Sequence, residues 1–308
     1  MTALNCSEPK NFIGKWDAPL RAERLSHMKI RFTKMHGCGN DYVYINGFTE
    51  KLTQEEKPEF VRRVSDRHFG IGSDGVIFIN PSEQADFEME MFNADGSRSE
   101  MCGNGIRCVA KFVHDKGLTD RRQFSIVSGG QIKYMDLTVE NGETVAVRVD
   151  MGEPQLVPGR IPVEADGDRA VNVPIEVCGQ EYRMTCVSMG NPHAVVFWED
   201  VDGLEIEKIG PHFENHPRFP RRTNTEFVQV IDQSHVKMRV WERGTGETLA
   251  CGTGCCATAV SCALNGLTGR HVTVQVLGGE LTIDWDEQSN HVFMTGPAEF
   301  VFEGEIEK

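Results

Sequence analysis

Short stretches of alternating or continuous apolar residues dominate this chain, and most of them are bounded by glycine or proline. Residues 29–34 alternate between polar and apolar positions, and the apolar runs YVYI and VIFI each follow a polar turn. Such short runs are typical of strands. The pattern predicts further strands near 86–92, 124–127, 132–139 and 144–149.

Two stretches of the first half have helical spacing instead. Apolar residues recur three and four positions apart within Glu50 to His68, and Ile106 to Lys116 is a short apolar run that Gly117 follows. A glycine just past the last helical residue is a common helix terminator. Strands and helices therefore alternate, and we predict a fold of the α/β (α+β) class.

A cysteine precedes a predicted helix in each half of the chain. Around Cys102 the chain reads FNADGSRSEMCGNGIRC, and around Cys251, 149 positions later, it reads WERGTGETLACGTGCC. An isolated cysteine at such a position is more often a small buried residue of the core than a functional group. The duplicated Gly-x-Gly context makes the functional interpretation the better one for Cys102 and Cys251. Free backbone N–H groups and the helix dipole favour a thiolate there, which predicts a lowered thiol pKa.

Two further loops recur in the same order. GCGNDYVYI around Asn40 is echoed by SMGNPHAVVF around Asn191, and HFGIGSDGVIF around Asp74 is echoed by RFPRRTNTEFV around Asn224. A period near 150 residues is too long for a solenoid. We predict two pseudo-symmetric domains that face one another across a cleft containing the active site.

Proline and glycine at 154–162 mark the crossing between the halves. We expect a flexible leader at 1–28, an N-terminal domain at 29–148 with a strand near 292–303 packing back on it, and a C-terminal domain at 149–291.

The repeated loops also supply candidate ligand groups. Backbone N–H groups at the two helix starts would hold a carboxylate, and the residues concerned are Gly103, Asn104, Gly252 and Thr253. Turn asparagines usually serve the backbone, but four of them in shared loops suggest a polar pocket: Asn40, Asn93, Asn191 and Asn224.

Three charged or titratable residues adjoin the same loops. Glu242 and Arg243 would by default form a surface ion pair of little energetic value. Next to the second cysteine loop, however, Arg243 is a natural bidentate clamp for a carboxylate. His193 follows the repeated Gly-Asn and is a candidate to assist proton transfer.

Composition narrows the function. The net charge of −14 and the absence of a basic run argue against nucleic-acid binding, and no apolar run has the length of a membrane span. Ten cysteines without paired C-x-x-C spacing indicate reduced thiols in a cytoplasmic protein and no zinc site. His212 and His216 lack a third ligand, and the G-x-G-x-x-G at Gly70 precedes a strand, which excludes a dinucleotide fingerprint.

Six blocks together resemble the signature of the diaminopimelate epimerase family over about residues 29–302: KMHGCGNDYVYI, DRHFGIGSDG, FNADGS, MCGNGIRC, SMGNPHAVV and ERGTGETLACGTG. The resemblance implies a cofactor-independent enzyme of lysine and peptidoglycan precursor synthesis, which interconverts LL- and meso-2,6-diaminopimelate. It also implies a homodimer of two-domain subunits, each domain a mixed sheet curled around a central helix.

The resemblance further implies roles for the candidate residues. Cys102 and Cys251 would be the base and the acid, assisted by His193 and Glu242, and the helix starts would bind the reacting carboxylate. The ends of the substrate would contact the remaining candidates, with Arg243 on the distal carboxylate: Asn40, Asn93, Asn191, Asn224, Glu242 and Arg243.

The chain departs from the family at two positions, and three other functions stay open. Cys38 stands where members often have leucine, which predicts redox sensitivity beside the pocket, and Gly75 stands where some have glutamine. A proline or hydroxyproline racemase would use the same two cysteines. A non-catalytic amino-acid-binding module would not need both, and a thiol redox sensor would consume peroxide without substrate.

Overall fold

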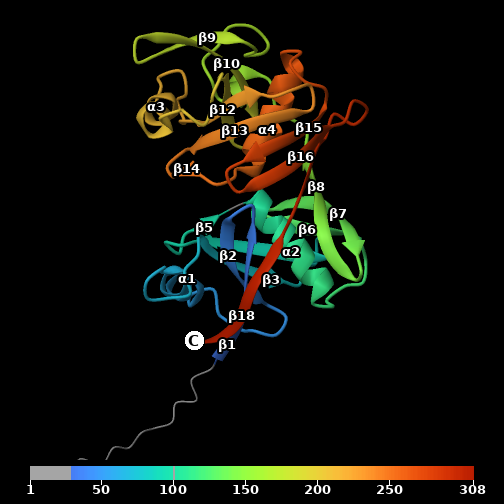
Figure 1. The fold of residues 1–308 in the computed structure, drawn as a ribbon. Helices are drawn as coiled ribbons and strands as arrows, with labels where there is room; N and C mark the ends of the chain where they lie inside the picture. Colours follow the sequence, from blue (N-terminus) through green and yellow to red (C-terminus); the bar gives the residue numbers. More distant parts are fainter. Residues whose placement is uncertain (1–28, 100) are drawn as a thin grey trace, which may run out of the picture.

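The computed structural model describes residues 29–99 and 101–308. The leader expected at 1–28 lies outside the described residues, as does Cys6. Figure 1 shows two bodies stacked on one another, with α2 inside one and α4 inside the other.

Within the described residues 29–99 and 101–152, the first half of the chain carries eight strands and two helices. They are β1 (Lys29–Gly37), β2 (Asn40–Asn46), α1 (Lys57–Ser65), β3 (Gly75–Asn80), β4 (Phe87–Asn93), β5 (Arg98–Ser99), α2 (Gly103–Asp115), β6 (Gln123–Ser128), β7 (Gln131–Glu140) and β8 (Glu143–Gly152).

The second half continues after a 3₁₀ turn, η1 (Pro158–Arg160). Its elements are β9 (Val173–Val177), β10 (Gln180–Ser188), β11 (Pro192–Phe197), α3 (Ile206–Glu214), β12 (Asn224–Val230), β13 (His235–Glu242), β14 (Gly246–Thr248), α4 (Gly252–Leu264), β15 (His271–Val276), β16 (Gly279–Trp285), β17 (Val292–Gly296) and β18 (Glu299–Glu307).

The two halves repeat one strand topology. In the first half, β1 pairs antiparallel with β2, β2 parallel with β3, and β3 antiparallel with β4. β4 then pairs parallel with β6, and the pairs β6–β7 and β7–β8 are antiparallel. The strands β10 to β13 and then β15 to β17 repeat this series with the same directions. Each half is therefore a mixed sheet, and the duplication that three loops indicated extends to every element.

The halves are joined by exchanged strands. β8 and β17, which occupy equivalent places, pair antiparallel with each other. After β17 the chain returns to the first half, where β18 pairs with β1 from Lys29 and Glu307 onward, and the two strands run side by side in Figure 1. The equivalent strand β9 pairs with β10 in the second half. Backbone hydrogen bonds thus connect the two bodies continuously.

Each sheet wraps a central helix. α2 contacts β1, β2, β7 and β8, and α4 contacts β10, β11, β12 and β15 to β17. Every residue of α2 from Gly103 to Val113 is buried, and so are most residues of α4. A helix surrounded by a sheet exposes little surface to water, which explains why α4 carries small and apolar residues all round. In α2 the polar side chains of Asn104, Arg107 and Lys111 are buried as well. Both helices contribute to one continuous core.

The outer helices are amphipathic in the ordinary way. α1 packs Phe60, Val61 and Val64 on the far face of the first sheet, and α3 packs Phe213 on the second. Across the described ranges 29–99 and 101–308, no helix has the length and apolarity needed to cross a membrane.

Two predicted helix boundaries were wrong. The segment expected at Glu50 to His68 is helical only from Lys57, because Pro58 fixes the backbone at the first turn. The helix expected from Ile106 begins at Gly103, because the Gly-Asn-Gly segment is helical and the sulfur of Cys102 caps it. The predicted termination at Gly117 was confirmed: its φ is +73°, and its N–H donates to the carbonyl of His114.

Candidate active site

The two cysteines lie at the starts of the two central helices, and these starts touch. Cys102 is the N-cap of α2 and Cys251 the N-cap of α4, both with extended backbone. A Cβ built on Gly103 would lie 3.7 Å from the Cα of Gly252 and 3.0 Å from Met294. The glycine after each cysteine therefore permits a close approach that a side chain would block. The fold brings the duplicated motifs from opposite halves to one place.

The sulfur of Cys102 has hydrogen-bond partners on two sides. The N–H of Gly105 donates to it at 3.3 Å, and the thiol donates to Oδ1 of Asn40 at 3.1 Å. Burial raises the pKa of the Cys102 thiol, and the backbone N–H groups of the helix start only partly oppose that effect. Cys102 is thus held as a thiol that both accepts and donates.

Cys251 is more strongly biased toward the thiol. Its sulfur lies 3.5 Å from Oγ1 of Thr253. Burial raises its pKa well above the ordinary value, and the negative charges of Glu242 and Glu226 raise it further.

The predicted lowering of the pKa of both thiols was therefore wrong. Desolvation can shift a fully buried group by up to about 3–5 pKa units. A helix dipole contributes about 0.3–1 kcal/mol, which is less than one unit. The sequence indicated the helix starts correctly but gave no sign of how deeply they are buried.

Glu242 and His193 reach the Cys251 side from β13 and β11. Burial raises the pKa of Glu242, whose Oε1 accepts a hydrogen bond from Thr248 at 2.5 Å. His193 is fully buried, with Nδ1 2.7 Å from Oε1 of Glu226 and Nε2 3.0 Å from Oδ1 of Asn191. Both ring nitrogens are thus committed to oxygen partners, which fixes the orientation of the ring.

Glu226 is a site residue that the sequence reasoning missed. It is fully buried on β12, two positions after Asn224, and a Cβ on Gly254 would lie 2.7 Å from its Oε1. Its other oxygen, Oε2, has no hydrogen-bond partner among the described residues. The available signal was a carboxylate two positions after Asn224 on the same strand, since residues two apart share one face.

The four asparagines differ in what they contact. Asn40 donates through Nδ2 to Asp74 at 2.7 Å, while Asn93 donates to Ser97 at 3.0 Å. Oδ1 of Asn224 accepts from the backbone N–H of Arg243 at 2.8 Å. Asn191 lies beside His193, so Asn40 is the one of the four whose side chain contacts a cysteine among these hydrogen bonds.

The side chain of Asn104 has a structural use besides the one predicted for its backbone N–H. Its side chain is buried, and Nδ2 donates to the carbonyl of Ala250 at 3.1 Å, which ties the start of α2 to the residue before Cys251. Its Oδ1 accepts from Arg107 at 3.0 Å. The side chain therefore joins the two halves, and only the backbone N–H of Asn104 remains a candidate for carboxylate binding.

Arg107, also missed, lies beneath this junction. Its side chain is fully buried and donates to the carbonyls of Gly103 at 3.2 Å and Pro297 at 3.1 Å, besides Asn104. By contrast, the side chain of Arg243 is partly exposed and donates to the carbonyl of Arg221 at 2.9 Å.

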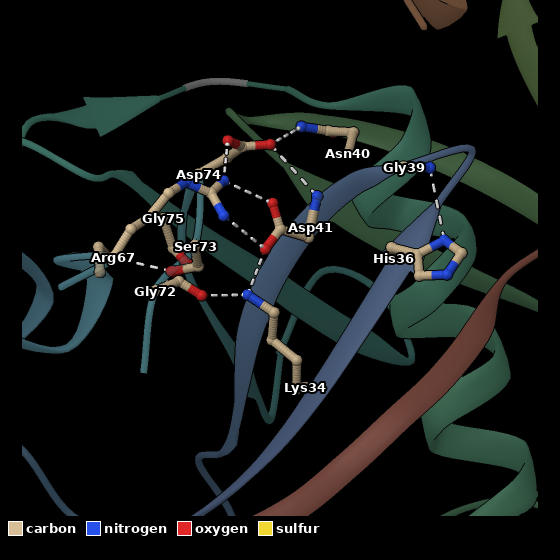
Figure 2. Close-up of polar contacts among 11 residues, drawn as sticks. Lys34, His36, Gly39, Asn40, Asp41, Arg67, Gly72, Ser73, Asp74 and Gly75 are labelled. Atoms are coloured by element: carbon tan, nitrogen blue, oxygen red, sulfur yellow. Dashed lines mark hydrogen bonds and ion pairs between the residues drawn. The ribbon is translucent and has the colours of Figure 1, made fainter. Parts of the chain in front are cut away.

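A charged cluster holds the loop beside Asn40 (Figure 2). Arg67 bridges the carboxylates of Asp41 at 2.7 Å and Asp74 at 2.8 Å, and Lys34 contacts Asp41 and the carbonyl of Gly72. Sequence reasoning did not select these residues, although DRHFGIGSDG concentrates charge in a glycine-rich loop. The cluster fixes the loop that carries Asp74 against β2.

Strand register corrects one detail of the repeat. Tyr42 pairs with Gly75, and His193 pairs with Asn224. Because Tyr42 and His193 both stand two positions after the repeated asparagine, Gly75 rather than Asp74 is the equivalent of Asn224.

The two departures from the family are both tightly packed. A Cβ on Gly75 would lie 2.0 Å from the carbonyl oxygen of Phe92, so this backbone has no room for the glutamine of other members. Cys38 is buried with a φ of +50°, and burial raises its pKa against the opposing charge of Arg107. The redox sensitivity expected of Cys38 is not supported, since buried thiols of raised pKa react slowly.

Metal binding has no candidate site in the part of the chain that the structure describes, where no three His, Cys, Asp or Glu side chains gather suitably. His212 and His216 thus lack partners for a metal site within these residues.

Comparison with known proteins identifies the family. The family model described as diaminopimelate epimerase matches residues 32–157 and 185–301. The curated diaminopimelate epimerase of Agathobacter rectalis is 59% identical over 285 residues, covering 90% of this chain and 99% of its own. That of Acetivibrio thermocellus is 57% identical over 278 residues, with coverage of 90% and 99%.

Solved structures of lower identity share the fold. A PhzF family phenazine biosynthesis protein of Bacillus anthracis superposes with a TM-score of 0.67 at 19% identity, covering 91% of this chain and 100% of its own. A hydroxyproline epimerase of Agrobacterium vitis gives 0.62 at 14%, with coverage of 90% and 91%. With paired cysteines at touching helix starts and matches over most of its length, the chain belongs to the diaminopimelate epimerase family.

Proposed function

We propose that this enzyme interconverts LL- and meso-2,6-diaminopimelate by proton transfer between Cys102, Cys251 and the α-carbon. The observation that carries the proposal is the contact between the two helix starts, because each start has a cysteine as its N-cap and the two come from opposite halves. Two sulfurs that approach one carbon from opposite sides can invert its configuration.

The chemistry balances without an external reactant. One cysteine, as a thiolate, takes the α-proton and becomes a thiol, and the electron pair of the broken C–H bond stays on the α-carbon and its carboxylate. The other cysteine, as a thiol, then gives its proton to the opposite face and becomes a thiolate. After a turnover the two thiols have exchanged protonation states, so the same pair serves the reverse direction.

The helix starts would stabilise the charge that develops. The backbone N–H groups of Gly103, Asn104, Gly252 and Thr253 would receive the reacting carboxylate, whose negative charge grows as the proton leaves. Because burial raises the pKa of both thiols, a thiolate needs compensation, which the substrate ammonium would supply at close range.

The neighbouring residues would assist the acid–base pair and hold the distal end of the substrate. Glu242 and His193 lie on the Cys251 side and would support its proton transfers. The distal amino-acid group would be bound by Arg243, Asn93, Asn191 and Asn224, with Arg243 on its carboxylate. Asn40 already donates to Asp74 and accepts from Cys102. It would contact the substrate through the second lone pair of its amide oxygen.

The wider biological setting belongs to the same proposal. We assign the enzyme to lysine and peptidoglycan precursor synthesis in the cytoplasm, as a homodimer that requires no cofactor and binds no nucleic acid. The pairing of β18 with β1 supports domains near 29–148 and 149–291, with the last strand returning to the first domain.

Proton NMR of LL-diaminopimelate in D₂O with reduced enzyme tests the proposal. We expect loss of the α-proton signal together with formation of the meso isomer. In Cys102→Ser and Cys251→Ser the turnover rate should fall by several orders of magnitude. The exposed Cys178→Ser is the matched control and keeps full turnover. Near wild-type rates in both active-site variants would refute the two-cysteine mechanism.

Parallel assays with other substrates, a binding measurement and a peroxide assay separate the alternatives. Exchange with proline or hydroxyproline, and none with diaminopimelate, would favour the racemase. Binding without exchange would favour an amino-acid-binding module, and peroxide consumption without substrate would favour a thiol sensor.

A further inference from the structure

The hydrogen bonds of Asp74 determine how the side-chain amide of Asn40 is turned. Oδ2 of Asp74 accepts from Nδ2 of Asn40 at 2.7 Å and from the backbone N–H of Asp41 at 3.2 Å. A carboxylate only accepts hydrogen bonds, so the amide nitrogen of Asn40 must face Asp74. The amide oxygen is then directed at the sulfur of Cys102, 3.1 Å away.

Asp74 is itself held on several sides, as Figure 2 shows. Its Oδ1 accepts from Arg67 at 2.8 Å, and Arg67 also contacts Asp41 at 2.7 Å. The backbone N–H of Asp74 donates to the carbonyl of Asp41 at 2.8 Å, and its carbonyl accepts from Ala94 at 3.0 Å. The carboxylate therefore has little freedom to leave Asn40.

The second half has no equivalent of this arrangement, in which a carboxylate orients an asparagine amide toward a cysteine sulfur. By strand register, the counterpart of Asp74 is Thr223, whose hydroxyl donates to the carbonyl of Pro192 at 3.2 Å. The counterpart of Asn40 is Asn191, which contacts His193 rather than Cys251. The pseudo-symmetry of the fold is thus broken where the environments of the two sulfurs differ.

We infer that Asp74 is a positioning residue that fixes the amide of Asn40 with its oxygen toward Cys102 and so holds this cysteine as a hydrogen-bond donor. The inference extends the proposed function, which gives Cys102 its catalytic role. It makes Cys102 and Cys251 chemically unequal: one faces a fixed acceptor, while the other faces a hydroxyl that can donate or accept.

The ionisation of Cys102 also depends on the charged and titratable groups around it. They are Tyr42, Tyr44, Cys108, Arg107 and Glu242. A variant that informs on Asp74 must therefore leave these groups in place and change only what the amide of Asn40 presents to the sulfur.

Asp74→Asn meets this requirement. An asparagine at 74 both donates and accepts, so the Asn40 amide becomes free to turn and donate to the sulfur. We measure the pH dependence of iodoacetamide labelling at Cys102 and Cys251 by peptide mass spectrometry. The expected result is a pKa for Cys102 lower by about one unit, which is about tenfold faster labelling below that pKa, with Cys251 unchanged.

Two controls separate amide orientation from loss of charge. Asp41→Asn removes a carboxylate from the same Arg67 without touching the Asn40 side chain, and it should leave the Cys102 profile near wild type. In an Asn40→Ala background, Asp74→Asn should cause no further shift, because the group that Asp74 orients is gone.

The inference is overturned by an unchanged Cys102 profile in folded Asp74→Asn, or by an equal shift in the Asn40→Ala background. If Asp74→Asn does not fold, the exposed Arg67→Gln loosens Asp74 instead and should shift the profile the same way by a smaller amount; no shift there overturns the inference as well. Labelling requires no turnover. An enzyme inactive on diaminopimelate would therefore refute the proposed function, while the labelling of Cys102 would still test the role of Asp74.

Discussion

Raising the pH should destabilise this protein through its buried thiols. Burial raises the pKa of Cys108, Cys186, Cys256 and Cys262 from the ordinary 9.0 to about 12. In the unfolded chain each of these thiols loses its proton near pH 9, whereas in the folded protein it keeps the proton. The folded state then binds more protons, so the free energy of unfolding falls as the pH rises. The stability is fully present below about pH 9 and is lost between pH 9 and 12.

The size of the effect follows from the same values. At pH 10, one unit above the unfolded pKa, ionisation favours the unfolded state by about 1.4 kcal/mol per thiol. Four such thiols together amount to about 5–6 kcal/mol, which is comparable with the whole stability of many proteins.

Urea denaturation with reductant at pH 7, 9 and 10 measures the loss. Cys262→Ala should remove about 1.4 kcal/mol of the difference between pH 7 and pH 10, and Cys178→Ser, at an exposed position, should remove none. An unfolding free energy that stays constant from pH 7 to 10, or that falls equally in Cys262→Ala and wild type, would refute the reasoning.

Two further predictions concern packing around the site. Glu226→Leu leaves the buried His193 without its 2.7 Å partner and should lower the free energy of unfolding by about 3–5 kcal/mol. Glu226→Gln should lower it by less. Equal denaturation midpoints for the two variants would contradict this account. Gly278→Ala places a Cβ 1.9 Å from the carbonyl oxygen of Cys38 and should cost about 1–3 kcal/mol or more. Its control Gly159→Ala, which meets nothing within 4 Å, should melt within about 2 °C of wild type, and a similar loss in both would show that the contact is not responsible.

Much of the fold could be inferred from the sequence, because its repeats mark turns that only particular residues allow. The Gly-x-Gly after Cys102 and Cys251 predicted two helix starts in equivalent settings, and both cysteines are helix N-caps. The alternating runs predicted the strands, since one face of each sheet packs on a central helix. Local propensity sufficed for these features.

Other features depended on contacts between residues far apart in the chain. A strand near 292–303 was expected to return to the first domain, but its partner β1 and the pairing of β8 with β17 join segments that no local pattern relates. The carboxylate of Glu226 beside His193, and that of Asp74 beside Asn40, became site features only when adjacent strands aligned them.

Residue type and spacing determined which groups carry the chemistry: two cysteines, each before a glycine-rich helix start. The tertiary structure decided how those groups ionise, because burial depends on every segment packed around them. The sequence predicted lowered thiol pKa values from the helix starts alone, and the two wrapped sheets raised them by removing water from both sulfurs.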